Sequence, residues 1–437
     1  MKAAVIGAGL AGVESAWQLT KHGVAVDLYE MKPEKRSPAH KTDWFAELVC
    51  SNSLKAERHN SAAGLLKEEM ASFGSLCVES ALQSRVPAGG ALAVDRDCFS
   101  KYITKKIEEN PQITVIRKEV TDLPDGYDAV IIAAGPLASD GISETVRALA
   151  GNGLSFYDAA APIVTAESVD MTEAFTQSRY DRGGVDDYIN CPLDKAQYEA
   201  FYEALISAES AELHSFDKRK DVYEGCMPIE VLASRGKDAM RYGPLKPVGL
   251  TNPKTGHRPW ANLQLRKENC AGTLYNLVGF QTNLKFGEQK RVFSMFPALK
   301  NAEFVRYGVM HRNTFLDSPR HLNGDFSLRN RPEIFFAGQI TGVEGYMESA
   351  ASGILAGLNA ARRLQALPTV ILPETTMMGA LSRYISDESV RDFQPMGANF
   401  GVLPPLTEKI RDKALRYTAL ADRAEADLQK FREEQGL

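Results

Sequence analysis

The sequence has few of the features that mark membrane-bound, secreted or metal-binding proteins. None of its apolar runs reaches the roughly 18 residues needed to cross a bilayer. Its six cysteines form no CxxC pair and no Cys/His spacing typical of a metal site. The apolar run after Lys2 is interrupted by glycines, and no cleavage site follows it, so it does not resemble a signal peptide. We therefore expect a cytoplasmic protein with free thiols, no membrane segment and no metal.

The charge of the chain is small overall but unevenly distributed. A formal net charge of −5 over 437 residues argues against a general nucleic-acid binder, and the composition is that of a globular enzyme with two or three domains. Residues 231–300 nevertheless contain twelve Lys and Arg against three Asp and Glu, a local balance of +9, which leaves −14 for the rest of the chain. Such a segment suggests one face for a polyanion, although a solvated surface with scattered charges explains it equally well.

The first thirty residues follow the pattern of a strand, a helix and a second strand. The apolar runs at 2–6 and 24–30 predict buried strands, and the 3.6-residue spacing over 10–22 predicts a helix between them. The turn before the helix has the GxGxxG pattern and consists of Gly7, Ala8, Gly9, Leu10, Ala11 and Gly12. In such a turn, the first glycine permits the tight bend, the second lets the backbone approach a pyrophosphate, and the third lets helix and strand pack closely.

An acidic residue completes the pattern. Glu30 ends the second strand, 18 residues after Gly12, where a carboxylate accepts hydrogen bonds from both ribose hydroxyls. The anionic pyrophosphate is favoured at the N-terminus of the helix. These features together predict a Rossmann-type site for an adenine dinucleotide; the alternative is a glycine turn that occurs by chance.

A second glycine-rich segment near the C-terminus favours FAD over NAD. A predicted strand at 334–337 ends at Gly338, further glycines follow at 342, 345 and 353, and a helix is predicted at 347–364. The N-terminus of that helix can face the pyrimidine ring of a flavin and stabilise negative charge there. A predicted strand at 127–134, ending at Gly135, adds the mid-chain strand typical of flavoproteins. A glycine-rich helix that serves packing alone is the alternative.

The α/β pattern is interrupted between about 155 and 300 by short strands and turns. We therefore expect an α/β fold with a Rossmann-type FAD-binding domain in two parts, residues 1–154 and 301–437. An inserted α+β substrate domain is expected at 155–300, and C-terminal helices end the chain. Further expected elements are a loop-like stretch at 31–60, helices at 62–72, 95–109 (with Asp95 as N-cap), 194–208 and 406–433, and a strand at 113–117. The apolar stripe of the last helix consists of Ile410, Leu415, Leu420, Ala424, Leu428 and Phe431.

Four segments together give the sequence a family resemblance. They are AAVIGAGLAGVESAWQL at 3–19, LVCSNSLK at 48–55, YEGCMPIE at 223–230 and FAGQITGVEGYMESAASG at 336–353. With them, the chain resembles the folate- and FAD-dependent tRNA (uracil-5-)-methyltransferases over essentially its whole length. These enzymes are smaller relatives of the glucose-inhibited division protein A family of tRNA-modifying flavoproteins. The two cysteine motifs are the specific part of the likeness, and the lack of a long helical C-terminal region favours the methyltransferase branch.

The resemblance implies a reaction and its participants. NAD(P)H reduces the FAD, and methylenetetrahydrofolate supplies a one-carbon unit that passes by way of the flavin to C5 of the uridine at T-loop position 54 of tRNA. The resemblance assigns the attack on uracil C6 to Cys226. It makes Cys50 the second active cysteine, which holds or protects the one-carbon unit or assists proton removal. Thiolates suit this chemistry because they add strongly and leave again by elimination. For each thiol, the alternative is a buried inert side chain.

Further residues are candidates for binding. Gly338, Gly345 and Tyr346 are expected at the cofactor, His311 fits a pterin-stacking role by resemblance, and Glu344 and Glu348 are weaker acid/base or pterin-binding candidates. A structural, hydrogen-bonded role is the alternative for each. The candidates for contacts with the tRNA backbone are Arg235, Lys237, Arg241, Lys246, Lys254, Arg258, Arg266, Lys285, Lys290 and Arg291. Tyr242 and Trp260 could stack on unstacked bases or pack in a core.

Three other functions are compatible with parts of the pattern. A flavin-dependent oxidoreductase of small molecules explains both glycine motifs but neither cysteine motif. A related flavoprotein that modifies the wobble uridine of tRNA, and a non-catalytic FAD-holding RNA-binding protein, are further alternatives. The oligomeric state and the choice between NADH and NADPH do not follow from the sequence.

Overall fold

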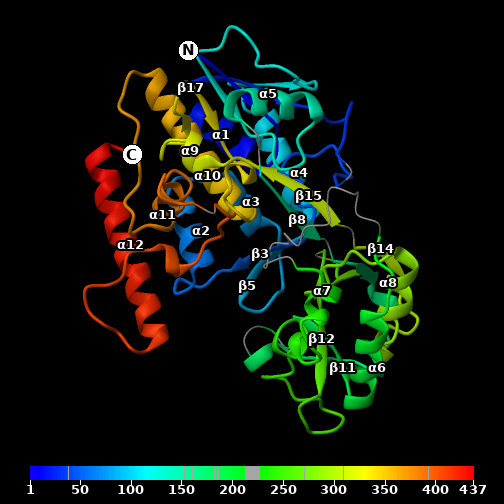
Figure 1. Cartoon of the computed structure of the whole chain (residues 1–437). Helices are drawn as coiled ribbons and strands as arrows, with labels where there is room; N and C mark the ends of the chain where they lie inside the picture. Colours follow the sequence, from blue (N-terminus) through cyan, green and yellow to red (C-terminus); the bar gives the residue numbers. More distant parts are fainter. Residues whose placement is uncertain are drawn as a thin grey trace.

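The computed structural model describes residues 1–437 except 38, 152–153, 160, 182–183, 185–186, 212–226, 270, 309 and 392, and only the backbone of 154–159, 181 and 310–314. Two hydrophobic cores organise the chain. The first core combines residues 3–150 with residues 315–428, whereas the second core is formed by residues 164–302. Figure 1 shows both chain ends on the part that holds the first core, away from β11 and β12 of the second.

A mostly parallel sheet lies at the centre of the first core. In order across the sheet, its strands are β16 (Ser327–Leu328), β17 (Arg331–Phe336), β7 (Ala129–Ile132), β1 (Lys2–Ile6), β2 (Ala25–Glu30) and β6 (Ile113–Arg117). Only β16 is antiparallel to its neighbour. Central parallel strands are covered on both faces, which is why Ala3–Val5 and Ile131–Ile132 are apolar and fully buried. The strands expected at 2–6, 24–30 and 113–117 are confirmed.

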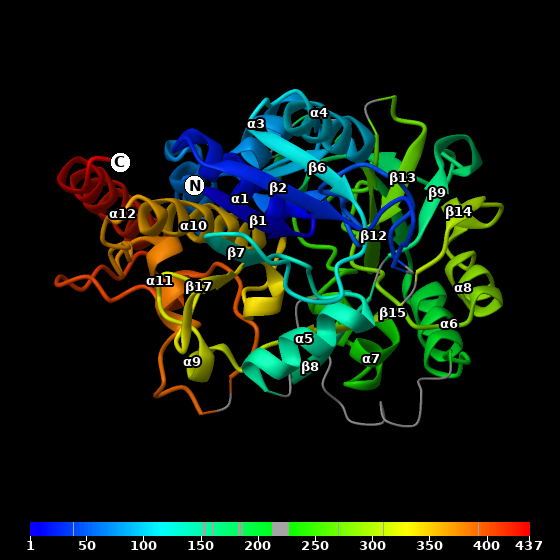
Figure 2. The same ribbon diagram turned by 90° about the horizontal axis from the view of Figure 1, so that it is seen from above.

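Two parallel helices pack against this sheet with their backbones in contact (Figure 2). They are α1 (Leu10–Lys21) and α10 (Tyr346–Leu364). A Cβ added at Gly353 would lie 2.2 Å from the Ala11 carbonyl oxygen, and one added at Gly357 would lie 2.6 Å from that of Ser15. Because Gly353 meets Ala11 and Gly357 meets Ser15, both helices run in the same direction and begin at the same edge of the sheet.

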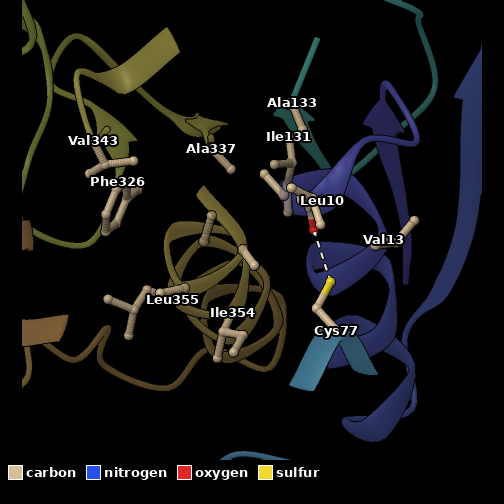
Figure 3. Close-up of a cluster of buried hydrophobic side chains, with 14 of the residues drawn as sticks. Leu10, Val13, Cys77, Ile131, Ala133, Phe326, Ala337, Val343, Ile354 and Leu355 are labelled. Carbon is tan, nitrogen blue, oxygen red and sulfur yellow. Dashed lines mark hydrogen bonds between the residues drawn. The ribbon is translucent and has the colours of Figure 1, made fainter. Parts of the chain in front are cut away.

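The start of α1 rests on a continuous apolar cluster (Figure 3). Leu10 and Val13 of α1, Ile131 of β7 and Ile354 of α10 contribute to it. The Cys77 thiol also lies there and donates to the Leu10 carbonyl oxygen over 3.9 Å. Burial raises the pKa of Cys77 well above its ordinary value, which disfavours the reactive thiolate.

The other elements of the first core surround this centre. Its remaining helices are α2 (Ala62–Ser72), α3 (Leu76–Gln83), α4 (Arg96–Glu108), α5 (Asp140–Ala150), α9 (Ser318–His321), α11 (Met377–Tyr384) and α12 (Lys413–Gln435). A three-stranded sheet consists of β3 (Ser53–Ala56), β5 (Ala91–Val94) and β4 (Arg85–Val86). The expected Asp95 cap of α4 is confirmed, since its carboxylate accepts from Cys98 N at 3.0 Å. The stretch 31–60 is not wholly loop-like, because β3 pairs with β5.

The last helix begins later than expected. It starts at Lys413, with the Asp412 side chain capping Leu415 N at 2.8 Å, so Ile410 lies outside the helix. Leu415 is exposed, and the buried stripe consists of Leu420, Ala421, Ala424 and Leu428. The reason is that Pro404 and Pro405 precede a strongly charged stretch, 408–413, that has no apolar face to bury. His59 joins this helix to α2 through contacts with Asp422 at 2.9 Å and Glu68 at 2.6 Å.

The chain leaves and re-enters the first part through one antiparallel pair of strands, β8 (Leu154–Ala159) and β15 (Met310–Phe315). Between them lies a second, largely antiparallel sheet. Its order is β10 (Phe175–Thr176), β11 (Tyr188–Leu193), β12 (Ala261–Lys267), β13 (Leu274–Leu277), β9 (Ile163–Thr165) and β14 (Phe304–Arg306). Among the described residues, the α-helices of this segment are α6 (Lys195–Ile206), α7 (Ile229–Ser234) and α8 (Phe286–Phe293). The expected α/β fold with an inserted α+β segment is confirmed.

Among the residues described, each helix is too short or too polar to traverse a lipid bilayer.

Candidate cofactor and active site

A cavity of about 410 Å³ lies at the carboxyl edge of the first sheet. Parallel α/β sheets bind ligands at this edge, and the volume falls within the usual range of about 300–1,000 Å³ for small-molecule sites. The wall includes residues from the segments 6–11, 29–32, 46–55, 118–120, 133–139 and 338–349. The glycine turn, the acidic end of β2, the first cysteine motif and the C-terminal glycine segment therefore meet at one cavity.

The three motif glycines have different surroundings. Gly7 has a φ of +100°, and its added Cβ would lie 2.6 Å from the Ala133 carbonyl oxygen, so the turn requires glycine. A Cβ at Gly12 would lie 1.7 Å from the Gly7 carbonyl oxygen, which is the close approach of helix and strand that the motif predicts. A Cβ at Gly9 would meet no atom within 4 Å, and Gly9 lines the cavity. The open space at Gly9 is thus where a pyrophosphate could approach the backbone.

Glu30 lies at the same end of the cavity with its carboxylate held by the backbone. One oxygen accepts from Ala8 N at 3.1 Å, and the other accepts from Lys32 N at 2.9 Å. Each carboxylate oxygen can still accept a further hydrogen bond. Because Glu30 is buried and faces the cavity, it is placed as a ribose-binding carboxylate should be.

The N-termini of α1 and α10 both point at the cavity, and no side chain caps either of them. By contrast, α2, α3 and α4 in the same core each have a Ser or Asp cap. Gly338 and Gly345, with φ of +90° and +124°, shape the turns before α10. Two uncapped helix ends suit two electron-rich groups, a pyrophosphate at α1 and a flavin pyrimidine ring at α10. The residues present therefore fit FAD.

Cys50 lies on the cavity wall in contact with Tyr346 at the start of α10. The Tyr346 hydroxyl oxygen is 2.9 Å from Cys50 Sγ and accepts from the backbone N of Cys50 at 2.8 Å and of Ser51 at 3.2 Å. Since the hydroxyl accepts from two backbone N–H groups, its own proton is free to point at the sulfur. Burial raises the pKa of Tyr346 well above its ordinary value, so the hydroxyl keeps this proton at neutral pH. The arrangement holds the Cys50 sulfur beside the cavity.

Lys55, which the sequence did not single out, lies on the same cavity wall as Cys50 and Tyr346. Lys55 Nζ is 2.6 Å from Glu348 Oε1, which also accepts from Ala398 N at 2.9 Å. Glu348 is buried and Glu344 lies nearby on the cavity wall, where its carboxylate accepts from Gln339 Nε2 at 2.5 Å. Lys55 stands in the motif LVCSNSLK, which was the signal that could have revealed it.

A second lysine had no sequence signal. Lys67 is buried in α2 and donates to the carbonyl oxygens of Leu54 at 2.9 Å and Ala63 at 2.6 Å. Burial lowers the pKa of Lys67 to about 8. Only the packing of α2 behind the cavity wall reveals this group.

Two of the expected site residues are not described in full. Cys226 lies outside the described residues. The backbone of His311 lies in β15 and pairs with Asp158 of β8, but its side chain is not described. Their roles at the site stay predictions.

The basic residues of 231–300 occupy two kinds of position. Arg266 is buried and donates to Asn52 and Ser51, so its expected role at a tRNA backbone is wrong: β12 is buried from Ala261 to Arg266, and the Arg266 side chain contacts the Cys50 loop. The other nine candidates for contacts with tRNA are exposed or half-buried. Four of these make ion pairs, namely Lys237 with Glu199, Arg241 with Asp238, Lys285 with Glu209 and Arg291 with Glu288.

The two aromatic candidates in this segment differ. Tyr242 is 85% exposed and therefore is not a core residue. Trp260 is 36% exposed, with the Arg241 guanidinium 3.9 Å from its ring centroid. Among the described residues no group of three or more His, Cys, Asp or Glu side chains could hold a metal ion.

Comparison with known proteins identifies the family. The family model described as Glucose inhibited division protein A matches residues 2–368. The chain is 56% identical over 434 residues to the methylenetetrahydrofolate--tRNA-(uracil-5-)-methyltransferase TrmFO of Desulfitobacterium hafniense, covering 99% of each chain. This chain belongs to the TrmFO branch of the glucose inhibited division protein A family. Another TrmFO relative, from Halalkalibacterium halodurans, is 54% identical and covers 98% of each chain.

Solved structures of GidA have a fold similar to that of this TrmFO chain. The chain aligns with Aquifex aeolicus GidA in two crystal forms, with TM-scores of 0.67 and 0.69 at 15% identity. The alignments cover 99% of this chain and 75% and 79% of GidA. At this identity, the likeness concerns the fold, and it agrees with the parallel sheet and the inserted antiparallel sheet described above.

Proposed function

We propose that this protein is an FAD-dependent methylenetetrahydrofolate--tRNA-(uracil-5-)-methyltransferase that forms 5-methyluridine at T-loop position 54 of tRNA. Methylenetetrahydrofolate is the one-carbon donor and NAD(P)H the reductant. One observation carries this proposal: in a chain 56% identical to a TrmFO enzyme over 99% of its length, the dinucleotide turn and Cys50 line the same cavity.

The residues that would hold FAD follow from the geometry of the cavity. Gly7, Ala8, Gly9, Leu10 and Ala11 would bind the pyrophosphate, Glu30 the ribose, and Gly338, Gly345 and Tyr346 the flavin end. Gly12, which does not line the cavity, would support this turn through its close packing against Gly7. The bound FAD would supply the electrons that convert the methylene unit to a methyl group. We assign this binding to residues 1–154 and 301–437, and the contacts with tRNA chiefly to residues 155–300.

The steps that fall to protein side chains concern the uracil ring. Uracil C5 is a poor nucleophile, but a thiolate that adds at C6 turns C5 into an enolate-like carbon that attacks a one-carbon electrophile. The C5 proton must then leave to a base, and the thiolate must leave C6 by elimination. We assign the addition at C6 to Cys226 and the second role to Cys50, whose sulfur the Tyr346 hydroxyl orients.

Binding of the donor and of tRNA involves the outer parts of the site. His311 and Glu344 are the candidates for holding the pterin. The exposed Lys and Arg side chains, among them Lys246, Arg258 and Lys290, would contact tRNA phosphates. The target uridine must be unstacked to reach a cavity of this kind, so base flipping is part of the proposed reaction. We place the protein in the cytoplasm, where thiols such as Cys50 and Cys98, which form no disulfide, stay reduced.

The deciding experiment is an assay with unmethylated tRNA, methylenetetrahydrofolate and NAD(P)H, with 5-methyluridine as the readout. The wild type should form 5-methyluridine, and a tRNA with cytidine at position 54 should not be methylated. Cys226→Ala and Cys50→Ala should abolish product while FAD stays bound, whereas Cys98→Ala, which removes an exposed thiol, should remain active. Absence of 5-methyluridine above background with the wild type would overturn the proposal. Modification at the wobble position instead would favour the related tRNA-modifying activity.

A further inference from the structure

Three arginines converge on the loop that carries Cys50. Arg96 of α4 donates to the carbonyl oxygens of Leu48 at 2.8 Å and Val49 at 3.3 Å. Arg306 of β14 also donates to the Val49 carbonyl oxygen. Arg266 of β12 donates to the side chains of Asn52 and Ser51, both at 3.1 Å. Guanidinium groups thus bind backbone carbonyl oxygens before Cys50 and side chains after it, and two of the three arginines come from the second sheet.

A single carboxylate balances these cations. Glu268, just after β12, forms an ion pair with Arg96 and is 5% exposed, while Arg266 is 6% exposed. Burial raises the pKa of Glu268, and Arg96, Arg266 and Arg306 each oppose that rise. We call Arg96, Arg266, Arg306 and Glu268 the arginine cluster. It contains three cations and one anion in a region with little access to water.

The other charges near Cys50 largely cancel. The charged or titratable side chains that line the same cavity include Glu47 and Lys55 of the Cys50 segment and Glu344, Tyr346 and Glu348 at the start of α10; Glu30, Lys32, His40, Lys118 and Glu119 line it as well. Glu348 is paired with Lys55, and Glu47 lies 3.7 Å from Lys32. Glu344 accepts a hydrogen bond from the neutral amide of Gln339 and so adds negative charge to the cavity wall. The arginine cluster is therefore the main source of net positive charge beside the Cys50 sulfur.

We propose that the arginine cluster positions the Cys50 loop and stabilises the Cys50 thiolate, with Glu268 limiting this effect by neutralising one arginine. A positive charge within several ångströms of a sulfur favours its anionic form, most strongly where water is excluded. The proposal deepens the proposed function, since it rests on Cys50 being an active thiol. These four are positioning residues, because they act on the reaction through Cys50.

The two kinds of charge in the cluster predict effects of opposite sign. Removing the cation at Arg306 should destabilise the thiolate, whereas removing the anion at Glu268 should stabilise it. A cluster that only holds the fold together would make both substitutions act in the same direction, by loosening the loop. Opposite signs therefore separate an electrostatic role from a structural one.

The test measures the alkylation rate of Cys50 by iodoacetamide in the FAD-loaded full-length protein between pH 6 and pH 9, with each cysteine followed by peptide mass spectrometry. Cys98, which is exposed, serves as the internal reference. At pH 7, Arg306→Gln should slow Cys50 labelling by about three- to tenfold relative to Cys98, and Glu268→Gln should accelerate it by a similar factor. Arg306→Lys retains the charge and should label like the wild type. Circular dichroism and flavin absorbance establish that each variant is folded.

The outcomes decide the proposal without reference to methyl transfer. If Arg306→Gln leaves the pH profile of Cys50 unchanged, or if Arg306→Gln and Glu268→Gln shift it in the same direction, the proposal is wrong. If Arg306→Gln does not fold, Arg96→Gln replaces it under the same criteria. Labelling requires neither tRNA nor folate, so an inactive enzyme with oppositely shifted profiles would contradict the proposed function alone. An active enzyme with unchanged profiles would contradict the arginine cluster alone.

Discussion

Replacing Gly12 by alanine should destabilise the first core, because the new methyl group has no space. Its Cβ would lie 1.7 Å from the Gly7 carbonyl oxygen and 2.9 Å from the Gly7 carbonyl carbon, both of which are backbone atoms. The start of α1 must then move away from the turn that follows β1. Overpacking of this kind lowers the free energy of unfolding by about 1–3 kcal/mol. The lower conformational entropy of the unfolded chain with alanine offsets about 0.4–1 kcal/mol of this loss. A net loss of about 1 kcal/mol corresponds to a fall in Tm of roughly 2–4 °C for a unit of this size.

Gly9→Ala is the matched control three residues earlier. Gly9 has a φ of −74° and a ψ of −174°, which alanine adopts without strain, and its Cβ would meet no atom within 4 Å. The stability of the protein without FAD should therefore be unchanged or slightly higher. The same methyl group occupies the space where a pyrophosphate would approach, so the affinity for FAD should fall by about tenfold or more, equivalent to at least ~1.4 kcal/mol.

Two measurements on each variant separate these effects. Thermal unfolding must be followed on protein stripped of FAD, since a bound ligand raises Tm by mass action. FAD affinity is measured by fluorescence titration. The reasoning is refuted if Gly9→Ala lowers the Tm of the stripped protein as much as Gly12→Ala does. It is refuted equally if Gly12→Ala unfolds at the wild-type temperature, or if Gly9→Ala binds FAD like the wild type.

Three further predictions concern single side chains. Glu30→Ala should weaken FAD binding by about tenfold in equilibrium dialysis, because a ribose loses its charged acceptor, and unchanged affinity would contradict the assignment. Tyr346→Phe should leave FAD bound but slow single-turnover methyl transfer, because the hydroxyl no longer orients the Cys50 sulfur; a wild-type rate would show that the contact is incidental. Hydrogen bonds to its two carboxylate partners raise the pKa of His59, so its contribution to stability is present below its unfolded pKa of about 6.5 and is lost as the pH rises through the raised folded value. The Tm of the wild type should therefore fall from pH 6 to pH 9 relative to that of His59→Gln, and parallel curves for the two proteins would disprove this linkage.

Local patterns in the sequence predicted the elements that hold the dinucleotide. The strand at 2–6, the glycine turn and the helix that follows are confirmed because each depends on residues close together in the chain: period and apolar character for the strand, and backbone freedom for Gly7. The late start of α12 was missed because the prediction extended an apolar period through Ile410 into a charged stretch that follows two prolines. Element ends depend on caps such as Asp412, which periodicity does not show.

The residues of the site were partly predictable, and their contacts were not. Cys50 and Tyr346 were both singled out from motifs, but 296 residues separate them, and no local pattern indicates that the hydroxyl of one meets the sulfur of the other. Arg266 was assigned to the surface because its segment is basic, whereas in the fold it is a buried residue of β12 that binds the Cys50 loop. A residue's charge is visible in the sequence, but its burial depends on which face of a strand meets another part of the chain.

The sequence alone thus determined that a dinucleotide turn is present, which fold class carries it and which cysteines are candidates, since these follow from short-range backbone requirements and residue chemistry. Only the tertiary structure decided that Glu30, Cys50, Glu348 and the start of α10 share one cavity, because parallel strands bring their carboxyl ends to one edge of the sheet. The tertiary structure also decided that three arginines from distant segments surround the Cys50 loop, since that arrangement arises only when the second sheet packs against the first part of the chain.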